Sequence, residues 1–402
     1  MKTHCFLRHL LMGVLLCLST LVRAQGVADK EILLGQSISL TGALAELSKG
    51  FTAGADAYFR VVNAAGGVNG RTIRVLTADD GYDPKKALAN VQEFERQGVF
   101  ALWQFVGTGT VREVSAVAAT KRIPLLAIAT GPRLRAELNP YTFYVRAGNT
   151  EELQRIVDHL ASTGVKRVAA VYIDAPYGIE AFEAIKNILK AKSASADAAA
   201  VPGTLPAMPP ARSAESLNLV ASASIKTNGD GSEAAARELL SANPQAVVMI
   251  TVPASSKAFV LAAQKVKLHA TIYSLNAGFP IDTVKELGDA AHGVVVCQVM
   301  PNVDRPAIPI VRDYRRDYEA AGHKTFTSAS LEGYINARIL VEALQRSSKP
   351  LTRDGLVKSL ESMSTLDLGG FIVHFSRSKH GGSKSVELSM SRVGAGGEGF
   401  VY

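Results

Sequence analysis

Residues 31–84 read in succession as strand, loop, helix, turn and strand, and this order is the strongest constraint on the fold. The apolar run 32–34 together with Ile38 predicts a strand that ends at the Thr41-Gly42 turn. A helix is predicted next, because apolar residues recur on one face at helical spacing: Phe51, Ala55, Phe59 and Val62. Gly66-Gly67 ends this helix, and residues 72–76 supply a second strand. A unit of this kind predicts a parallel sheet with buried strands.

Strand-like runs then recur along most of the chain, and helical segments separate most of them. They cover residues 99–106, 125–128, 167–173, 246–251, 271–275 and 294–299. This alternation is typical of doubly wound α/β sheets. The 378 residues after residue 24 exceed what one hydrophobic core usually fills, so two domains are expected.

Several short motifs occur in a fixed order along this pattern. They are the glycine turn 65–70, the acidic Asp-Pro loop 79–84, Gly107-Thr108-Gly109-Thr110, Ile123-Pro124, Ala129-Thr130-Gly131, Arg146, and Asp174-Ala175-Pro176-Tyr177-Gly178. In these motifs the chain resembles the leucine/isoleucine/valine-binding family, the type I periplasmic binding proteins of ABC transporters. The resemblance covers roughly residues 30–375.

The resemblance implies two doubly wound parallel-sheet lobes joined by a three-segment hinge. It places lobe 1 at residues 27–147 plus 300–376, and lobe 2 at residues 148–299 plus 377–402. Residues 191–231 are rich in Ala, Ser and Pro, which favours an enlarged surface loop of lobe 2. A docking surface for a partner is the functional alternative for this segment.

The first 24 residues indicate export. Basic residues precede the apolar stretch 10–18, and Val22-Arg23-Ala24 suits cleavage after Ala24, so we expect a signal peptide and a periplasmic protein. A lipoprotein signal around Cys17 is the alternative, although Leu16 before it is bulky. Removing residues 1–24 takes away three basic residues and no acid, so the net charge falls from +8 to +5. The remaining excess is scattered, which disfavours nucleic-acid binding.

The expected ligand site lies where loops follow the strands, because ligands of parallel α/β sheets bind beyond the carboxyl ends of the strands. Loops at Thr41-Gly42, at residues 107–110 and at residues 129–132 combine small residues, hydroxyls and free backbone N–H groups. This combination suits a carboxylate. Thr108 and Thr130 resemble the positions at which the family binds the carboxylate of an amino acid. A simple helix-capping role is the alternative for both.

Lobe 2 is expected to contribute an aromatic ring and an amide. Tyr177 resembles a family aromatic that closes over the ligand, with packing at a helix start as the alternative. Asn276 stands where binders of aliphatic amino acids usually carry a carboxylate for the ligand's ammonium, and an amide cannot neutralise a buried positive charge. We therefore hypothesise a small carboxylate without an α-ammonium, or an amide. The full set of expected ligand-binding residues is Thr41, Gly107, Thr108, Ala129, Thr130, Gly131, Tyr177, Pro253 and Asn276.

No motif supports catalysis. Arg112 stands where a dinucleotide fingerprint needs its third glycine, and the chain has no P-loop, Gly-x-Ser-x-Gly or His-Glu-x-x-His motif. The histidines are widely spaced, so neither a metal nor a cofactor is expected. Cys297 lies in an apolar run and is expected to be a buried free thiol.

The resemblance implies a monomeric solute-binding protein of a branched-chain-amino-acid-type ABC importer, with an inner-membrane permease and ATPases as partners. It would bind an amino acid, another small carboxylate or an amide in the interlobe cleft by hinge closure. The alternative is a ligand-sensing protein that docks onto a receptor or kinase.

Overall fold

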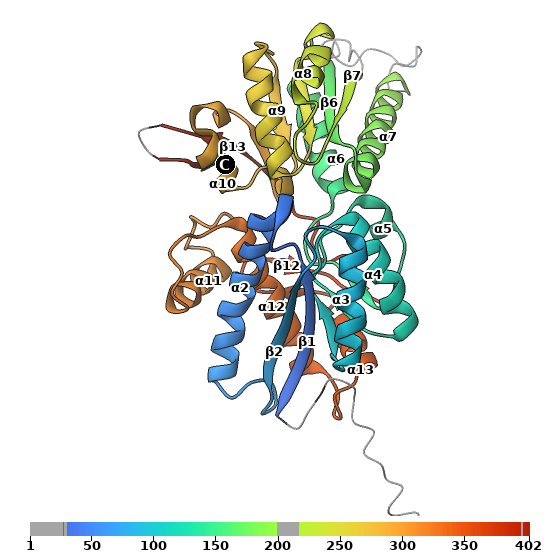
Figure 1. Ribbon diagram of the computed structural model, residues 1–402, viewed down its shortest axis with the longest axis vertical. Coiled ribbons are helices and arrows are strands. Elements are labelled where there is room, and N and C mark those ends of the chain that lie inside the picture. Colours follow the sequence, from blue (N-terminus) through green and yellow to red (C-terminus); the bar gives the residue numbers. More distant parts are fainter. Residues whose placement is uncertain (1–26, 28–29, 199–216, 395–396) are drawn as a thin grey trace, which may run out of the picture.

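Two separate β-sheets organise the chain in the computed structural model, which describes residues 27, 30–198, 217–394 and 397–402 (Figure 1). The N-terminal sheet and its helices form the lower part of Figure 1, here called lobe 1, and the other sheet forms the upper part, lobe 2. The predicted signal peptide lies outside the described residues. Within them, no helix has the length and apolarity needed to cross a membrane.

The sheet of lobe 1 is fully parallel, with strand order β2-β1-β3-β4-β5. Its strands are β1 (Glu31–Ile38), β2 (Thr72–Asp79), β3 (Ala101–Trp103), β4 (Leu125–Leu126) and β5 (Thr142–Phe143). Its helices are α2 (Ala45–Ala64), α3 (Pro84–Arg96), α4 (Thr108–Lys121), α5 (Pro132–Ala136), α11 (Pro309–Ala320), α12 (Ser328–Arg346) and α13 (Arg353–Glu361). A two-stranded sheet of β11 (Leu366–Asp367) and β12 (Ile372–Val373) completes this lobe.

The sheet of lobe 2 is mostly parallel, with strand order β14-β13-β10-β9-β8-β6-β7. Its strands are β6 (Arg167–Ile173), β7 (Asn218–Ile225), β8 (Ala246–Ile250), β9 (Thr271–Ser274), β10 (Val295–Gln298) and the antiparallel β13 (Glu387–Arg392) and β14 (Gly399–Val401). Its helices are α6 (Asn149–Ser162), α7 (Pro176–Ala198), α8 (Ser232–Ser241), α9 (Pro253–Lys265) and α10 (Ile281–Leu287), with the 3-10 turns η2 (Asn276–Gly278) and η3 (Gly288–Ala291). The prediction of two doubly wound, mainly parallel sheets is confirmed.

Strand prediction succeeded where helices cover both faces of the sheet. β8 is an example, because all five of its residues are buried and all are apolar. A strand buried on both faces is a continuous apolar run, which the sequence shows directly.

The chain passes between the lobes three times. Residues 299–375 return to the core of lobe 1, and β13 and β14 join the sheet of lobe 2. Residues 380–383 still hydrogen-bond to Tyr144 and Val145 of lobe 1, which favours a last passage after residue 383. The exact lobe boundaries stay a prediction.

The prediction of a surface loop at residues 191–231 is wrong at both ends. Helix α7 continues to Ala198, because alanine is the strongest helix former. Residues 218–225 form the edge strand β7, parallel to β6, and their small side chains gave a weak apolar signal. The middle of the segment, residues 199–216, lies outside the described residues.

Candidate functional site

A cavity lies between the lobes, beyond the carboxyl ends of the strands. Its walls come from both lobes, and its space measures about 510 Å³ including the open mouth. The lining residues are Leu44, Leu47, Tyr82, Val106, Gly107, Thr108, Ala129, Thr130, Arg135, Arg146, Ala147, Gly148, Asn149, Tyr177, Val252 and Ala277.

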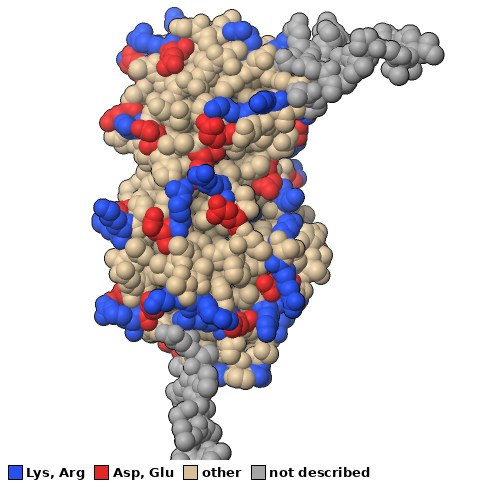
Figure 2. All heavy atoms as spheres, turned by 90° about the vertical axis from the view of Figure 1, so that its right-hand side faces the viewer, with Lys and Arg blue, Asp and Glu red and all other residues tan. Residues whose placement is uncertain are grey.

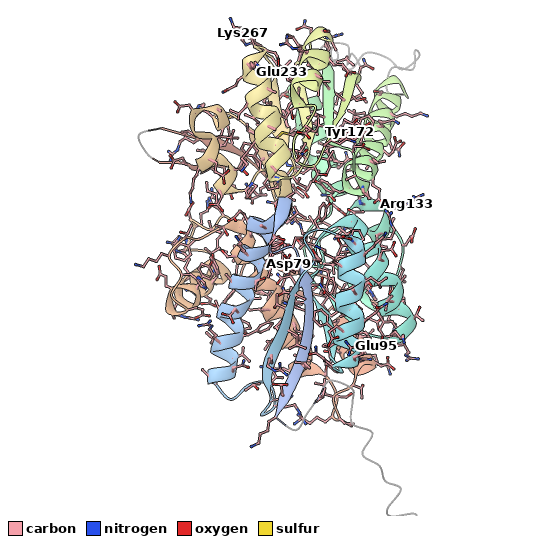
Figure 3. The ribbon with its side chains drawn as sticks, viewed as in Figure 1. Asp79, Glu95, Arg133, Tyr172, Glu233 and Lys267 are labelled. Atoms are coloured by element: carbon pink, nitrogen blue, oxygen red, sulfur yellow. The ribbon has the colours of Figure 1, made fainter. Side chains whose placement is uncertain are left out.

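Five of the nine predicted site residues line this cavity: Gly107, Thr108, Ala129, Thr130 and Tyr177. Their roles in binding stay predictions. The other four, Thr41, Gly131, Pro253 and Asn276, lie outside its lining. Thr41 is exposed, and its hydroxyl donates to Asp79 Oδ2 over 2.6 Å at the junction of the lobes (Figure 3). Pro253 is the buried first residue of α9.

Gly107 caps α4 with a φ of 110°, a conformation that favours glycine. A Cβ atom here would approach the Tyr82 ring to 2.4 Å, so glycine is also required by space. The next residue, Thr108, accepts a hydrogen bond from the Gly131 N–H over 2.9 Å. Thr108 therefore joins the loops after β3 and β4, which explains why Gly131 itself does not face the cavity.

Two hydroxyl groups in the cavity are buried without any hydrogen-bond partner among the described residues. They are Thr130 Oγ1 from lobe 1 and Tyr177 Oη from lobe 2. Burial also raises the pKa of Tyr177 well above its usual value, so the phenol stays neutral and can donate. Buried polar groups are rarely unpaired, because the loss of hydration costs about 1–3 kcal/mol. A ligand that accepts or donates hydrogen bonds would satisfy both.

A buried ion network lies against one side of the cavity. Arg146 Nη1 is 3.2 Å from Glu332 Oε2, and its Nη2 is 3.6 Å from Glu152 Oε1. Arg146 Nη2 also donates to Asn276 Oδ1 over 2.9 Å, and the Asn276 backbone N–H donates to Glu152 Oε2 over 2.7 Å. Burial raises the pKa of both glutamates, and Arg146 opposes this rise. The amide of Asn276 therefore serves as a partner of Arg146 in this network.

Arg135 lines the cavity from α5 and was not predicted as a site residue. Its Nη2 donates to the backbone carbonyl of Arg146 over 3.0 Å, and its guanidinium carbon lies 4.6 Å from the centre of the Tyr144 ring. Burial lowers its pKa. The sequence held one usable signal, because Arg135 lies in the first turn after Pro132, directly beyond the loop 129–132 that was already assigned to the site.

Apolar side chains form the rest of the wall. Leu44 ends the 3-10 turn η1 (Gly42–Leu44), and Leu47 lies in the first turn of α2. Val106 follows β3, and Val252 and Ala277 come from lobe 2. Tyr82 adds an aromatic face, and burial raises its pKa to about 12. The cavity thus combines a polar, cationic region with an apolar one.

No metal site is evident in the part of the chain that the structure describes, where no three His, Cys, Asp or Glu side chains are grouped to hold an ion. Cys297 is a buried free thiol, as predicted. Burial raises its pKa well above the usual value, which disfavours the reactive thiolate.

Comparison with known proteins places this architecture in a family. The family model described as "Periplasmic binding protein" matches residues 31–397. The chain belongs to the periplasmic binding proteins. This family and its fold are those of solute-binding proteins rather than enzymes.

Individual members of the periplasmic binding protein family share modest sequence identity with this chain. A Leu/Ile/Val-binding protein homolog 1 of Brucella melitensis is 28% identical over 167 residues, which cover 40% of this chain and 44% of that relative. A substrate-binding periplasmic protein of Ralstonia solanacearum is 28% identical, with a TM-score of 0.78 over 90% of this chain and 97% of that structure. A solute-binding protein of an ABC transporter from Rhodopseudomonas palustris, in complex with 3,4-dihydroxy benzoic acid, has a TM-score of 0.75 at 17% identity, with 92% and 95% covered.

The surface of this periplasmic binding protein carries both charge signs. Figure 2 shows Lys and Arg interspersed with Asp and Glu on one face, and a constriction between the two lobes.

Proposed function

We propose that this periplasmic binding protein is the solute receptor of an ABC importer and that it holds a small carboxylate in the cavity between its lobes. The unpaired hydroxyls of Thr130 and Tyr177, which reach one enclosed cavity from opposite lobes, carry this proposal. The N-terminus of α4 opens onto the same cavity at Gly107 and Thr108, where the helix dipole and free N–H groups favour an anion.

Binding by hinge closure accounts for a site divided between two lobes. The ligand would first contact the lobe 1 loops around Thr108 and Thr130, and lobe 2 would then bring Tyr177 over it. Arg112 of α4 pairs with Glu180 of α7 at the interface of the lobes, so closure also forms contacts that do not involve the ligand. A ligand shifts the population toward the closed form only by the ratio of its affinities for the closed and open forms.

The known relatives support two ligand classes. The Brucella relatives are named as Leu/Ile/Val-binding protein homologues, which favours an amino acid. The Rhodopseudomonas palustris protein binds 3,4-dihydroxy benzoic acid, which is a carboxylate without an ammonium. The fold therefore accommodates an aromatic acid. The residues that line the cavity determine whether an amino acid or a carboxylate without an ammonium binds.

The proposed partners are an inner-membrane permease and its ATPases, which would recognise the closed, monomeric form in the periplasm. A sensor that docks onto a receptor or kinase is the second candidate function. The same closed form would serve both, so the partner has to be identified separately.

A thermal-shift screen of the chain from residue 25 tests the proposed function. The compounds are aliphatic amino acids, aromatic carboxylates, short branched acids and amides. A ligand at about 100 times its Kd stabilises the fold by about 2.7 kcal/mol, which raises the unfolding temperature measurably. Stabilisation by carboxylates supports the proposal, and a response to none of the four classes would contradict it.

A further inference from the structure

We infer that Arg135 is the counter-ion of the ligand and that the site selects monocarboxylates without a positively charged group. The inference rests on the proposed function and adds the class of ligand. A short aliphatic or aromatic body attached to one carboxylate fits it.

The guanidinium of Arg135 has unused binding capacity. It makes no ion pair with any carboxylate among the described residues, and one of its five N–H groups donates to the Arg146 carbonyl. A cation held in a largely buried position without a paired anion is costly. An anionic ligand in the cavity would remove this cost and accept a forked pair of hydrogen bonds.

The charges around the cavity favour an anion and disfavour a cation. Arg135 and Arg146 are the charged residues among those that line it, and none of the lining residues is Asp or Glu. The two carboxylates whose charges act on Arg135, Glu151 and Glu152, already have hydrogen-bond partners. Glu151 accepts from the Gly148 N–H, and Glu152 accepts from Asn276 and pairs with Arg146. The ammonium of an amino acid would therefore meet no carboxylate in the lining.

The positions of the lining groups indicate how a ligand would be oriented. Arg135 comes from α5, Leu44 from the turn η1 and Leu47 from the first turn of α2. In Figure 1, α5 and α2 lie on different sides of lobe 1. A carboxylate held near Arg135 and the hydroxyl of Thr130 would direct its apolar body toward the leucines. Tyr177 would close over it from lobe 2.

Calorimetric titration with matched compounds tests this inference. The probes are benzoate and its neutral isostere benzamide, and 4-methylpentanoate and L-leucine, which differ by one ammonium group. Wild type should prefer each carboxylate without an ammonium over its matched probe. In R135Q the affinity for benzoate or 4-methylpentanoate should fall about 10- to 100-fold, as expected for a charged hydrogen-bonded pair. The affinity for benzamide should change little, so the preference for the carboxylate should nearly disappear.

Two further variants make the result specific. R135K keeps the positive charge but loses the paired N–H donors of the guanidinium. It should retain an intermediate preference for carboxylates. R133Q is the matched control, because Arg133 lies on the same helix but is exposed at the right-hand edge of Figure 3. Thermal unfolding of each variant without ligand establishes that it is folded.

Each outcome decides between the two proposals. Equal loss of affinity for benzoate and benzamide in R135Q, or unchanged binding of both, would overturn the role of Arg135 and leave the proposed function intact. Tighter binding of L-leucine than of 4-methylpentanoate by wild type would overturn the proposed ligand class alone. A wild-type protein that binds none of the probes, nor any compound of the thermal-shift screen, would overturn the proposed function and this inference with it.

Discussion

At the scale of single residues, the hydroxyl of Tyr177 offers a test that separates folding from binding. It is buried and lacks a partner in the described part of the chain, so the closed form without ligand bears its desolvation cost. Y177F should leave the free energy of unfolding unchanged or raise it by about 1 kcal/mol. The same variant should lower the affinity for a bound carboxylate about 3- to 10-fold, the value of one hydrogen bond. Urea denaturation and calorimetry measure the two effects.

Y172F is the matched control for Y177F. Tyr172 lies on β6 outside the cavity lining and stacks on Phe182 (Figure 3). Its loss of a hydroxyl should change neither ligand affinity nor the preference among ligands. Unchanged affinity in Y177F would show that this hydroxyl does not contact the ligand.

The glutamates around Arg146 predict a pH-dependent stability. Burial raises the pKa of Glu332 above its ordinary value of 4.5, although Arg146 opposes the rise. The folded protein therefore holds this proton more tightly than the unfolded chain. This contribution to stability is complete below pH 4.5 and is lost as the pH rises through the raised pKa.

E332Q removes this titration and keeps one acceptor oxygen for Arg146. We expect a loss of at most about 1 kcal/mol in the free energy of unfolding near pH 4.5, because glutamine replaces a protonated carboxyl of the same shape and can still accept a hydrogen bond from Arg146. The loss should become smaller as the pH rises, because only the wild type loses stability through Glu332. Urea denaturation at about pH 4.5, 6 and 8 measures the difference, and a loss that grows with pH would contradict the assignment.

Part of the site could be predicted from the sequence, because residues that directly follow parallel strands lie together at one edge of the sheet. Thr130 and Tyr177 each follow an apolar strand closely, so their meeting at the edges of the two sheets was predictable. The network of Arg146 was not, since its partners Asn276 and Glu332 are 130 and 186 positions away. Asn276 was assigned to the ligand because it resembles a family position after the strand 271–275, and the sequence shows no sign that Arg146 occupies its amide. Its contact with a ligand stays a prediction.

At the scale of elements, the packing of α2 against α12 depends on two glycines. A Cβ atom on Gly54 would lie 1.8 Å from the Ser330 carbonyl oxygen, and one on Gly333 would lie 2.0 Å from the Phe51 carbonyl oxygen. Backbone lies against backbone at both positions, so the helices cannot relax by moving a side chain. G333A should therefore destabilise the fold by at least about 1–3 kcal/mol.

Thermal unfolding of G333A measures this loss as a lower midpoint temperature. G399A is the matched control, because Gly399 lies in β14 with no atom near its missing Cβ and without a positive φ. Its midpoint should stay close to that of wild type. An equal effect of both substitutions would show that close helix contact is not the cause.

Strands could be predicted from the sequence where both faces of the strand are buried and its apolar run is long. The predicted strand 167–173 coincides with β6, which lies between two neighbouring strands inside its sheet. The edge strands β7 and β14 and the antiparallel β13 were not predicted, because alternating or small residues give a weak apolar signal. Their positions depend on pairing with other strands: β7 with β6, β13 with β10, and β14 with β13.

At the scale of the whole molecule, Glu180 links the two lobes directly. It lies on α7 of lobe 2, pairs with Arg112 of α4, and accepts from the Arg133 N–H of α5 over 3.3 Å. Its side chain is 11% exposed, and that of Arg112 is 44% exposed. These contacts exist only when the lobes are together, so they favour the closed form without touching the ligand.

E180Q should therefore weaken ligand binding through the closure equilibrium. A partly exposed ion pair contributes up to about 1 kcal/mol after screening by solvent, so the affinity should fall no more than about fivefold. The preference between benzoate and benzamide should not change, because the cavity lining is intact. Salt should weaken binding less in E180Q than in wild type, since the screened pair is already absent. E183Q is the matched control, because Glu183 is an exposed residue of the same helix that pairs with Lys186 within α7. If E180Q instead changed the preference between the two probes, Glu180 would act on the ligand itself, and the separation between a selecting cavity and a closing interface would fail.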